Sequence, residues 1–120
     1  KPPEITPLDN YSLVTNDDDA TTRVVDAFRK HFPAGRIRET GPTSASEDFG
    51  SFGAAWKVPS VFWFVGGTDP DVYAKAKVEN RLNEIPTNHN PRFLPVLHPT
   101  LEVGVETLMV AARAWLSAAR

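Results

Sequence analysis

The hydrophobic pattern of the chain predicts a core strand near its middle. Residues 58–67, Val-Pro-Ser-Val-Phe-Trp-Phe-Val-Gly-Gly, form the longest nearly unbroken apolar run and end on two glycines. Strands that are buried on both faces read as continuous hydrophobic runs, whereas a helix of this apolarity is usually longer and rarely has a proline and a glycine pair at its ends. We therefore expect a buried central strand at 58–67, followed by a loop.

An amphipathic helix is predicted upstream of this strand. The acidic residues 17–19 follow Asn16, so this stretch supplies an N-cap candidate and first-turn carboxylates that suit the positive end of a helix dipole. Apolar residues then recur at steps of three and four, the pattern of a helix packed on one side: Val24, Ala27, Phe28 and Phe32. We expect this helix to end at Pro33 and Gly35.

A second amphipathic helix is predicted at the carboxyl end. Pro99 suits a first helical turn, and the clearest apolar stripe of the chain follows it: Leu101, Val105, Leu108, Ala112, Trp115, Leu116 and Ala119. Gly104 lies inside this helix at a cost of about 1 kcal/mol relative to alanine. Such a glycine predicts that another backbone passes close to that turn.

Shorter elements are predicted between these helices. We expect a half-buried strand at 36–40, a short helix at about 47–55 capped by Ser44 or Ser46, and a partly helical surface excursion at 69–90. The proline-rich residues 2–14 read as extended chain or an edge strand, and residues 92–97 as a brief extended segment. Together these elements predict an α/β fold, a few-stranded sheet with helices packed on it.

The loop after the central strand is the first candidate site. In open α/β sheets, ligands bind where the chain leaves the carboxyl ends of the strands. The loop opens with Gly66, Gly67 and Thr68, whose backbone N–H groups could approach a ligand carboxylate. Two glycines at the end of a strand are also common in simple turns, so the residues alone leave both interpretations open.

His89 is the histidine best suited to chemistry, because it lies between Asn88 and Asn90 in a polar loop bounded by Pro91. A neutral imidazole there could bind a metal or move protons near neutral pH. The residues alone favour a turn histidine that is hydrogen-bonded to backbone. His31 and His98 have no metal-ligand spacing to each other or to His89, and we assign them no site role.

Glu47 and Asp48 form a second polar cluster. Adjacent residues on a helix point about 100° apart, so these two cannot act as a carboxylate pair on one substrate atom. They would either favour the positive end of a helix dipole or orient a histidine or substrate group. Arg92 is either an anion partner or a surface arginine.

Composition narrows the classes of function. The 120 residues are 41% hydrophobic and 23% charged, with a net charge of -2. No basic excess is present, which argues against nucleic acid or an anionic membrane as partner. No run approaches 18 apolar residues, and the first residues resemble neither a signal nor a transit peptide. The absence of cysteine excludes disulfides and fits a cytoplasmic protein, while a first residue other than Met suggests a piece of a longer chain.

Four motifs in a fixed order carry a family resemblance. They are Ser46-Glu47-Asp48-Phe49, the Val58-Pro59 strand ending in glycines, His89-Asn90-Pro91-Arg92-Phe93, and a final helix with a Gly-Val-Glu turn. Over residues 11–120 the chain resembles the carboxyl-terminal part of the metal-dependent amidohydrolases, which include N-acyl-amino-acid amidohydrolases, hippurate hydrolases and aminoacylase- and carboxypeptidase-like peptidases. The resemblance implies a partial zinc-peptidase-like catalytic domain at 15–120, preceded at 1–14 by an extended connector from a lid domain.

The resemblance also implies a chemistry. In such enzymes a two-metal centre, usually of zinc or manganese, polarises an amide carbonyl and activates a bridging water. The histidine of the family's His-x-Pro-x-Phe motif is a metal ligand and matches His89. The Ser-Glu-Asp-Phe motif implies supporting or substrate contacts for Glu47 and Asp48, and we expect Gly66–Thr68 and Asn90 to lie near the substrate.

The chain departs from the family pattern in ways that limit its activity. The other metal ligands and the catalytic glutamate pair are absent from the sequence, and Leu94–Leu97 replaces an acidic run. We therefore expect a parent enzyme that hydrolyses N-acyl amino acids or peptides, whereas the 120-residue chain is inactive alone and self-associates through exposed apolar surface. Two alternatives remain open: a non-catalytic binding module, and an interaction segment whose residues 1–14 add a strand to a partner's sheet.

Overall fold

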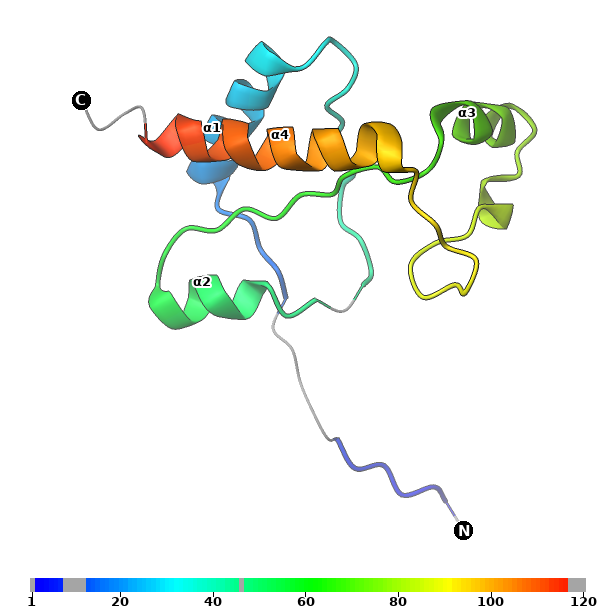
Figure 1. The fold of residues 1–120 in the computed structure, drawn as a ribbon. Coiled ribbons are helices and arrows are strands. Elements are labelled where there is room, and N and C mark those ends of the chain that lie inside the picture. The colour runs from blue at the N-terminus through cyan, green and yellow to red at the C-terminus, as the bar shows by residue number, and fades with distance from the viewer. Residues whose placement is uncertain (1, 8–12, 46, 117–120) are drawn as a thin grey trace. The chain divides into compact units, whose positions relative to one another are not determined.

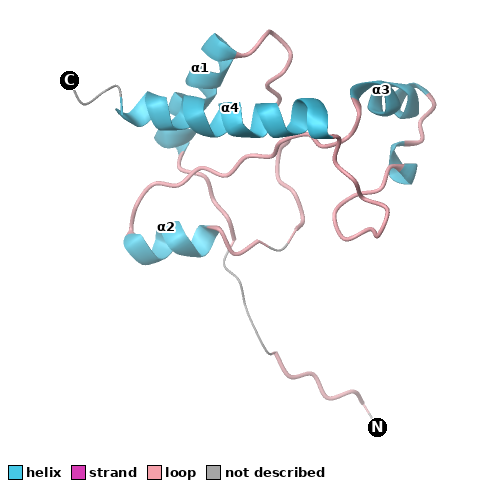
Figure 2. Cartoon of the chain, viewed as in Figure 1, coloured by secondary structure: helices cyan, strands magenta, loops and turns pink. Residues whose placement is uncertain are grey.

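The structure, a computed structural model, describes residues 2–7, 13–45 and 47–116. Its helices, joined by loops, are α1 (Asp18–His31), α2 (Gly50–Trp56), α3 (Pro70–Val78), the 3-10 helix η1 (Leu82–Glu84) and α4 (Leu97–Leu116) (Figure 1). No strand occurs in these described ranges (Figure 2). The predicted α/β fold with a few-stranded sheet is therefore wrong.

The chain divides into two compact units. The first is made of the described residues within Lys1–Trp63 and Ala114–Arg120, and the second of Phe64–Arg113. The division falls inside the predicted central strand, between Trp63 and Phe64. The predicted boundary at residue 14 rests on the family resemblance and stays a prediction.

The predicted central strand at 58–67 is an extended loop. A strand needs a neighbouring extended backbone that supplies alternating donors and acceptors. In the first unit, Ser60 O accepts a hydrogen bond from Asp17 N at 3.0 Å, and Phe62 is bound by the side chain of Asn16. In the second unit, Gly66 O accepts from the Thr100 hydroxyl at 3.2 Å. These partners belong to loops and helix ends, so no ladder forms.

The other predicted strands are also wrong in the described part of the chain. Residues 36–40 have no regular structure and are mostly exposed, so neither face has a layer to pack against. Residues 2–7 are likewise irregular, and 8–12 lie outside the described residues. The extended segment expected at 92–97 is interrupted, because Arg92 belongs to a turn and Leu97 already begins α4.

Helix α1 confirms the prediction made from its cap and apolar stripe. Asp17 is its N-cap residue, and the Asp17 carboxylate accepts a hydrogen bond from Ala20 N at 2.9 Å. Ala20, Val24 and Phe28 are buried. The Phe28 ring meets the Trp63 ring edge to face, with centroids 5.5 Å apart, so this stripe forms the apolar centre of the first unit.

Helix α2 begins at Gly50, later than the expected start at 47, and Ser44 does not cap it. Phe49 occupies the N-cap position without a side-chain hydrogen bond, and Ser46 lies outside the described residues. Gly53 is buried against the loop that follows the helix. A Cβ atom at Gly53 would lie 2.6 Å from Ser60 Oγ, so this contact requires glycine.

The partly helical excursion predicted at 69–90 is confirmed as α3 followed by η1. The Asp69 carboxylate caps α3 by accepting hydrogen bonds from the backbone N–H groups of Asp71 and Val72. After α3, Asn80 has a left-handed backbone with φ 56°. Arg81 N bonds Ala76 O, and Asn80 N bonds Lys77 O, a Schellman ending that turns the chain into η1.

Helix α4 confirms that the carboxyl end is helical, but the apolar stripe predicted as its packed face is wrong, because Leu101, Val105 and Leu108 are exposed and Thr107 and Ala111 are buried instead. His98 is non-helical, with φ -109° and ψ 127°, so regular helix starts at Pro99. The close approach expected at Gly104 is wrong, since no atom would lie within 4 Å of a Cβ there. Among the described residues, none of the helices combines the length and the apolarity needed to cross a bilayer.

Candidate functional site

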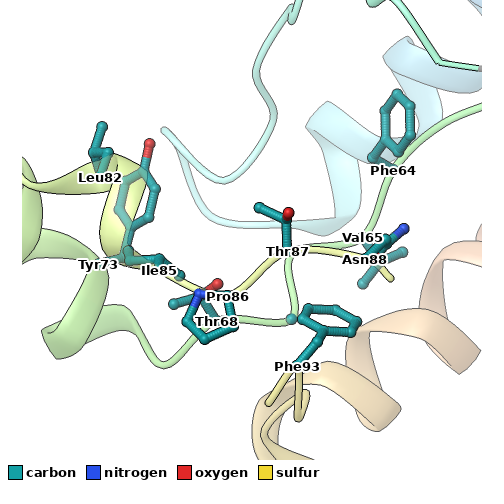
Figure 3. A pocket seen from close by; sticks show the side chains of 11 residues that line it. Phe64, Val65, Thr68, Tyr73, Leu82, Ile85, Pro86, Thr87, Asn88 and Phe93 are labelled. Atoms are coloured by element: carbon teal, nitrogen blue, oxygen red, sulfur yellow. The ribbon is translucent and has the colours of Figure 1, made fainter. Parts of the chain in front are cut away.

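The second unit contains an open, mostly apolar pocket of about 430 Å³. Figure 3 shows its lining side chains, which come from four segments: the extended loop after Trp63, helix α3, the η1 region and the loop that carries His89 (Figure 3). The lining residues are Phe64, Val65, Gly67, Thr68, Tyr73, Leu82, Ile85, Pro86, Thr87, Asn88 and Phe93. A concave apolar site with a few polar groups is the usual form of a small-molecule site.

The Gly67 turn forms one wall of the pocket because it packs tightly on the segment before α4. Gly67 O accepts a hydrogen bond from Val96 N at 2.9 Å. A Cβ at Gly67 would lie 3.2 Å from Pro95 Cβ, so a side chain there would push the two segments apart. The turn thereby holds Thr68 at the pocket, and Thr68 brings a hydroxyl group to a largely apolar wall.

The His89 loop forms another wall through two consecutive turns. Asn90 N donates to Thr87 O at 3.0 Å, and Phe93 N donates to Asn90 O at 2.9 Å. The Asn90 side chain stabilises the second turn by accepting from Arg92 N at 2.9 Å. These turns bring Asn88 and Phe93 to the pocket.

His89 itself is exposed and is not a lining residue. Its backbone is left-handed, with φ 69°, at the third position of the first turn. Glycine adopts that conformation without cost, and asparagine, aspartate and histidine adopt it more often than other residues, so the strain at His89 is at most about 1–2 kcal/mol. The loop therefore keeps an imidazole where glycine would fit more easily, and such strain is often found at functional positions.

The described residues do not fit a complete metal centre. Within ranges 2–7, 13–45 and 47–116, no three histidine, cysteine, aspartate or glutamate side chains lie close enough together to hold a metal ion. A catalytic zinc site needs at least three protein ligands. His89 can offer one imidazole, so these residues provide at most part of a metal site.

Glu47 and Asp48 lie in the first unit, and their contacts are local. Glu47 Oε1 accepts hydrogen bonds from Asp48 N and Phe49 N, both at 3.1 Å. The Asp48 side chain is exposed, and Asp48 O accepts from Ser51 N at 2.9 Å. The Glu47 carboxylate thus satisfies backbone donors just before α2, the structural role that the sequence left open.

Charged groups near the pocket have identifiable roles. A second hollow, of about 200 Å³, shares Gly67, Thr68 and Phe93 with the first and adds Asp69 and Arg92. The Asp69 carboxylate is occupied by the start of α3. The Arg92 guanidinium has no ionic partner in the described part of the chain, which keeps it available for an anion.

An exposed ion cluster at the α3–η1 corner shifts the pKa values of Arg81 and Glu84. Arg81 donates to both carboxylate oxygens of Glu84, at 2.8 and 2.6 Å, and to Glu79 at 3.1 Å. The hydrogen bonds from Arg81 lower the pKa of Glu84, and the same contacts raise the pKa of Arg81. Because the cluster is exposed, it stabilises the corner only weakly.

Several pocket residues were missed by sequence reasoning, namely Tyr73, Leu82, Ile85, Pro86 and Thr87. We interpreted 69–90 as a surface excursion because its apolar residues match no single helical face. That mismatch was itself a usable signal. Apolar side chains in a polar stretch that share no helical stripe can be gathered by a bent backbone, and here Tyr73, Leu82 and Ile85 line the pocket around η1 while staying partly exposed.

Comparison with known proteins adds no assignment, since no family model and no solved structure matches this chain.

Proposed function

We propose that this chain is part of a metal-dependent amidohydrolase that hydrolyses N-acyl amino acids or peptides, with His89 as one metal-binding imidazole. The resemblance of the ordered motifs supplies the reaction class. The observation that most supports a metal-binding role for His89 is its left-handed turn, which lies next to a pocket wall formed by Asn88 and Phe93.

The geometry supports this role because metal binding and substrate binding would fall to different residues. The exposed imidazole of His89 is accessible to ligands supplied from elsewhere. Beside it, the pocket offers apolar walls and the hydroxyl and amide groups of Thr68 and Asn88 to a substrate. When bound, a zinc or manganese pair would polarise an amide carbonyl and activate water.

The proposal assigns no complete catalytic step to these residues. Gly66, Gly67, Thr68 and Asn90 shape or line the substrate side, while Glu47 and Asp48 retain the local contacts described above. The remaining metal ligands and the general base would come from another part of the parent enzyme. The chain alone should therefore be inactive. We also propose that the protein is cytoplasmic, which the lack of cysteine supports.

The experiment is to sequence the coding DNA upstream of Lys1 in frame, and then to express the full-length protein. We expect an upstream segment rich in histidine and aspartate, followed by a Glu-Glu pair. In the full-length enzyme, His89→Gln should lower the metal content by about one ion of two and reduce N-acyl amino acid hydrolysis at least a hundredfold.

His31→Gln is the matched control, because His31 is an exposed histidine in the last turn of α1. This variant should keep both metal content and activity. Full metal content and activity in His89→Gln would contradict the proposed ligand role. A gene whose product lacks further metal ligands would contradict the amidohydrolase proposal as a whole.

A second candidate, a non-catalytic binding module, is favoured by the pocket itself. Its mostly apolar lining suits a small apolar or aromatic ligand. In that case the 120-residue chain binds such a compound on its own, and His89→Gln leaves the binding unchanged. Thermal shift with a fragment set, repeated on His89→Gln, tests this candidate: unchanged binding supports it, and lost binding contradicts it.

A further inference from the structure

Helix α4 carries an exposed apolar stripe that is independent of the pocket. Leu101, Val105 and Leu108 are 57%, 54% and 63% exposed, and Ala112 is also exposed. Thr107 and Ala111 are buried, so the helix already has one covered face. The stripe is a second apolar face, which is unusual for a helix that packs on one side only.

The spacing of the stripe is that of a helix pair. Its members follow one another at steps of four, three and four residues, which is the a/d repeat of helices that pack knobs into holes. Such a stripe is self-complementary, because a leucine or valine of one copy fits between residues of the same stripe on another. A pair of identical copies related by a two-fold axis uses one surface twice.

Charge decides the direction of the pairing. Glu102 and Arg113 lie on the same flank of the stripe, about 16 Å apart along the helix, and Glu106 adds negative charge near Glu102. In an antiparallel pair centred on Leu108, this flank meets its own copy, so Arg113 of each chain lies beside Glu102 of the other. In a parallel pair the flank meets the opposite edge, where Gly104 and Ala111 carry no charge.

The charged partners are also available for this contact. Glu102 Oε1 is bound to His98 Nδ1 at 2.7 Å, which leaves Oε2 for a second donor. Arg113 is exposed and has no ionic partner among the described residues. An arginine and a carboxylate at the rim of an apolar seam set register and direction more than they set affinity.

We propose that two copies of this chain associate through α4, antiparallel, with the Leu108 side chains meeting at the two-fold axis. This self-association goes beyond the proposed function and does not depend on it. One helical stripe is a small interface, so the dissociation constant should lie in the range of about 10–500 μM.

Sedimentation equilibrium of the 120-residue chain from about 5 μM to 1 mM measures this association. Leu108→Glu places two like charges at the axis and should abolish the dimer. Val78→Glu is the control, because Val78 is an exposed apolar residue on α3, at 88% exposure. Circular dichroism verifies that each variant keeps its helices. A wild-type chain that stays monomeric at 1 mM overturns the proposal.

Direction is tested by disulfide trapping, which is unambiguous because the chain has no cysteine. Leu108→Cys puts two thiols together at the axis, so oxidation should give a covalent dimer at least tenfold faster than for Leu101→Cys. In the antiparallel pair, the two Leu101 positions lie about 21 Å apart along the axis, beyond disulfide reach. Equal trapping at both positions overturns the antiparallel arrangement.

A charge swap tests the flank. Arg113→Glu should raise the dissociation constant roughly twofold to thirtyfold, because two symmetric pairs are lost. Adding Glu102→Arg should bring the constant back toward the wild-type value. An unchanged constant in Arg113→Glu, or no recovery in the double variant, overturns the Glu102–Arg113 pairing.

Discussion

The side chain of Asn16 binds both backbone groups of Phe62. Its Nδ2 donates to Phe62 O at 2.8 Å, and its Oδ1 accepts from Phe62 N at 2.7 Å. This pair of bonds reproduces what a neighbouring strand would provide at one residue. This amide side chain and the Asp17 N–Ser60 O bond therefore hold the extended segment after α2 in place of a sheet.

Replacing Asn16 by alanine should destabilise the first unit by about 1–3 kcal/mol, since two partly buried backbone groups lose their partners. Urea unfolding followed by circular dichroism measures the change. Thr15→Ala is the control, because Thr15 is exposed. Equal stability of the two variants would show that water replaces the Asn16 amide without cost.

Gly53→Ala should lower the free energy of unfolding by about 1–2 kcal/mol, although alanine favours helix, because the new methyl group would meet Ser60 Oγ at 2.6 Å. Adding Ser60→Ala should recover part of the loss. Gly104→Ala is the opposite case, with no atom within 4 Å, and should gain about 1 kcal/mol. A gain in Gly53→Ala would refute the close packing of α2 on the loop.

Asn80 ends α3 in the left-handed conformation, with φ 56°. Asn80→Gly should keep or raise stability, whereas Asn80→Ala should lose about 1 kcal/mol, because alanine resists that conformation. Thermal unfolding of the two variants side by side measures the difference. Indistinguishable midpoints would mean that the Schellman ending contributes little to the corner.

The Arg81–Glu84 pair should give a small pH dependence of stability. The hydrogen bonds from Arg81 lower the pKa of Glu84 in the folded chain. The folded state is therefore stabilised when Glu84 is ionised. The contribution is present above the ordinary glutamate pKa of about 4.3 and is lost as pH falls through the lowered value. Glu84→Gln should remove this part of the acid sensitivity, compared with wild type in urea unfolding at pH 3 to 6; an identical pH profile would exclude it.

Replacing His89 by glycine should raise the stability of the isolated chain by up to about 1–2 kcal/mol, because glycine removes the left-handed strain. His89→Ala should give no such gain. Differential scanning calorimetry of both variants measures this. A loss in His89→Gly would mean that the imidazole makes stabilising contacts, and strain would then no longer support a functional role.

Helices were predictable from this sequence because their signals are local. The Asp17 cap and the Val24–Phe28 stripe define α1 within a few residues, and Pro99 with its apolar stripe defines the regular part of α4. The predicted strand at 58–67 depended on a distant backbone partner. Apolar character alone cannot supply that partner, and in the described residues Asn16 and loop groups take its place.

The pocket was predictable in part for the same reason. Gly67, Thr68 and Asn88 stand at loop positions that the turn pattern marks, and they line the pocket. Tyr73 and Leu82 reach it through the bend between α3 and η1, a geometry set by Asn80 and not by hydrophobic periodicity. The local role of Glu47 depends on where α2 starts, three residues later than its acidic motif suggests.

The bond pair between Asn16 and Phe62 also makes the chain sensitive to chemical ageing. Deamidation would exchange the Asn16 nitrogen for oxygen, leaving a carboxylate that accepts hydrogen bonds but cannot donate one. Phe62 O would then face a negative charge where it now receives a hydrogen atom. A modification that changes the mass of the chain very little would thus weaken the attachment of the extended segment after α2, leaving it held by the Asp17 N–Ser60 O bond and the Phe28–Trp63 ring contact.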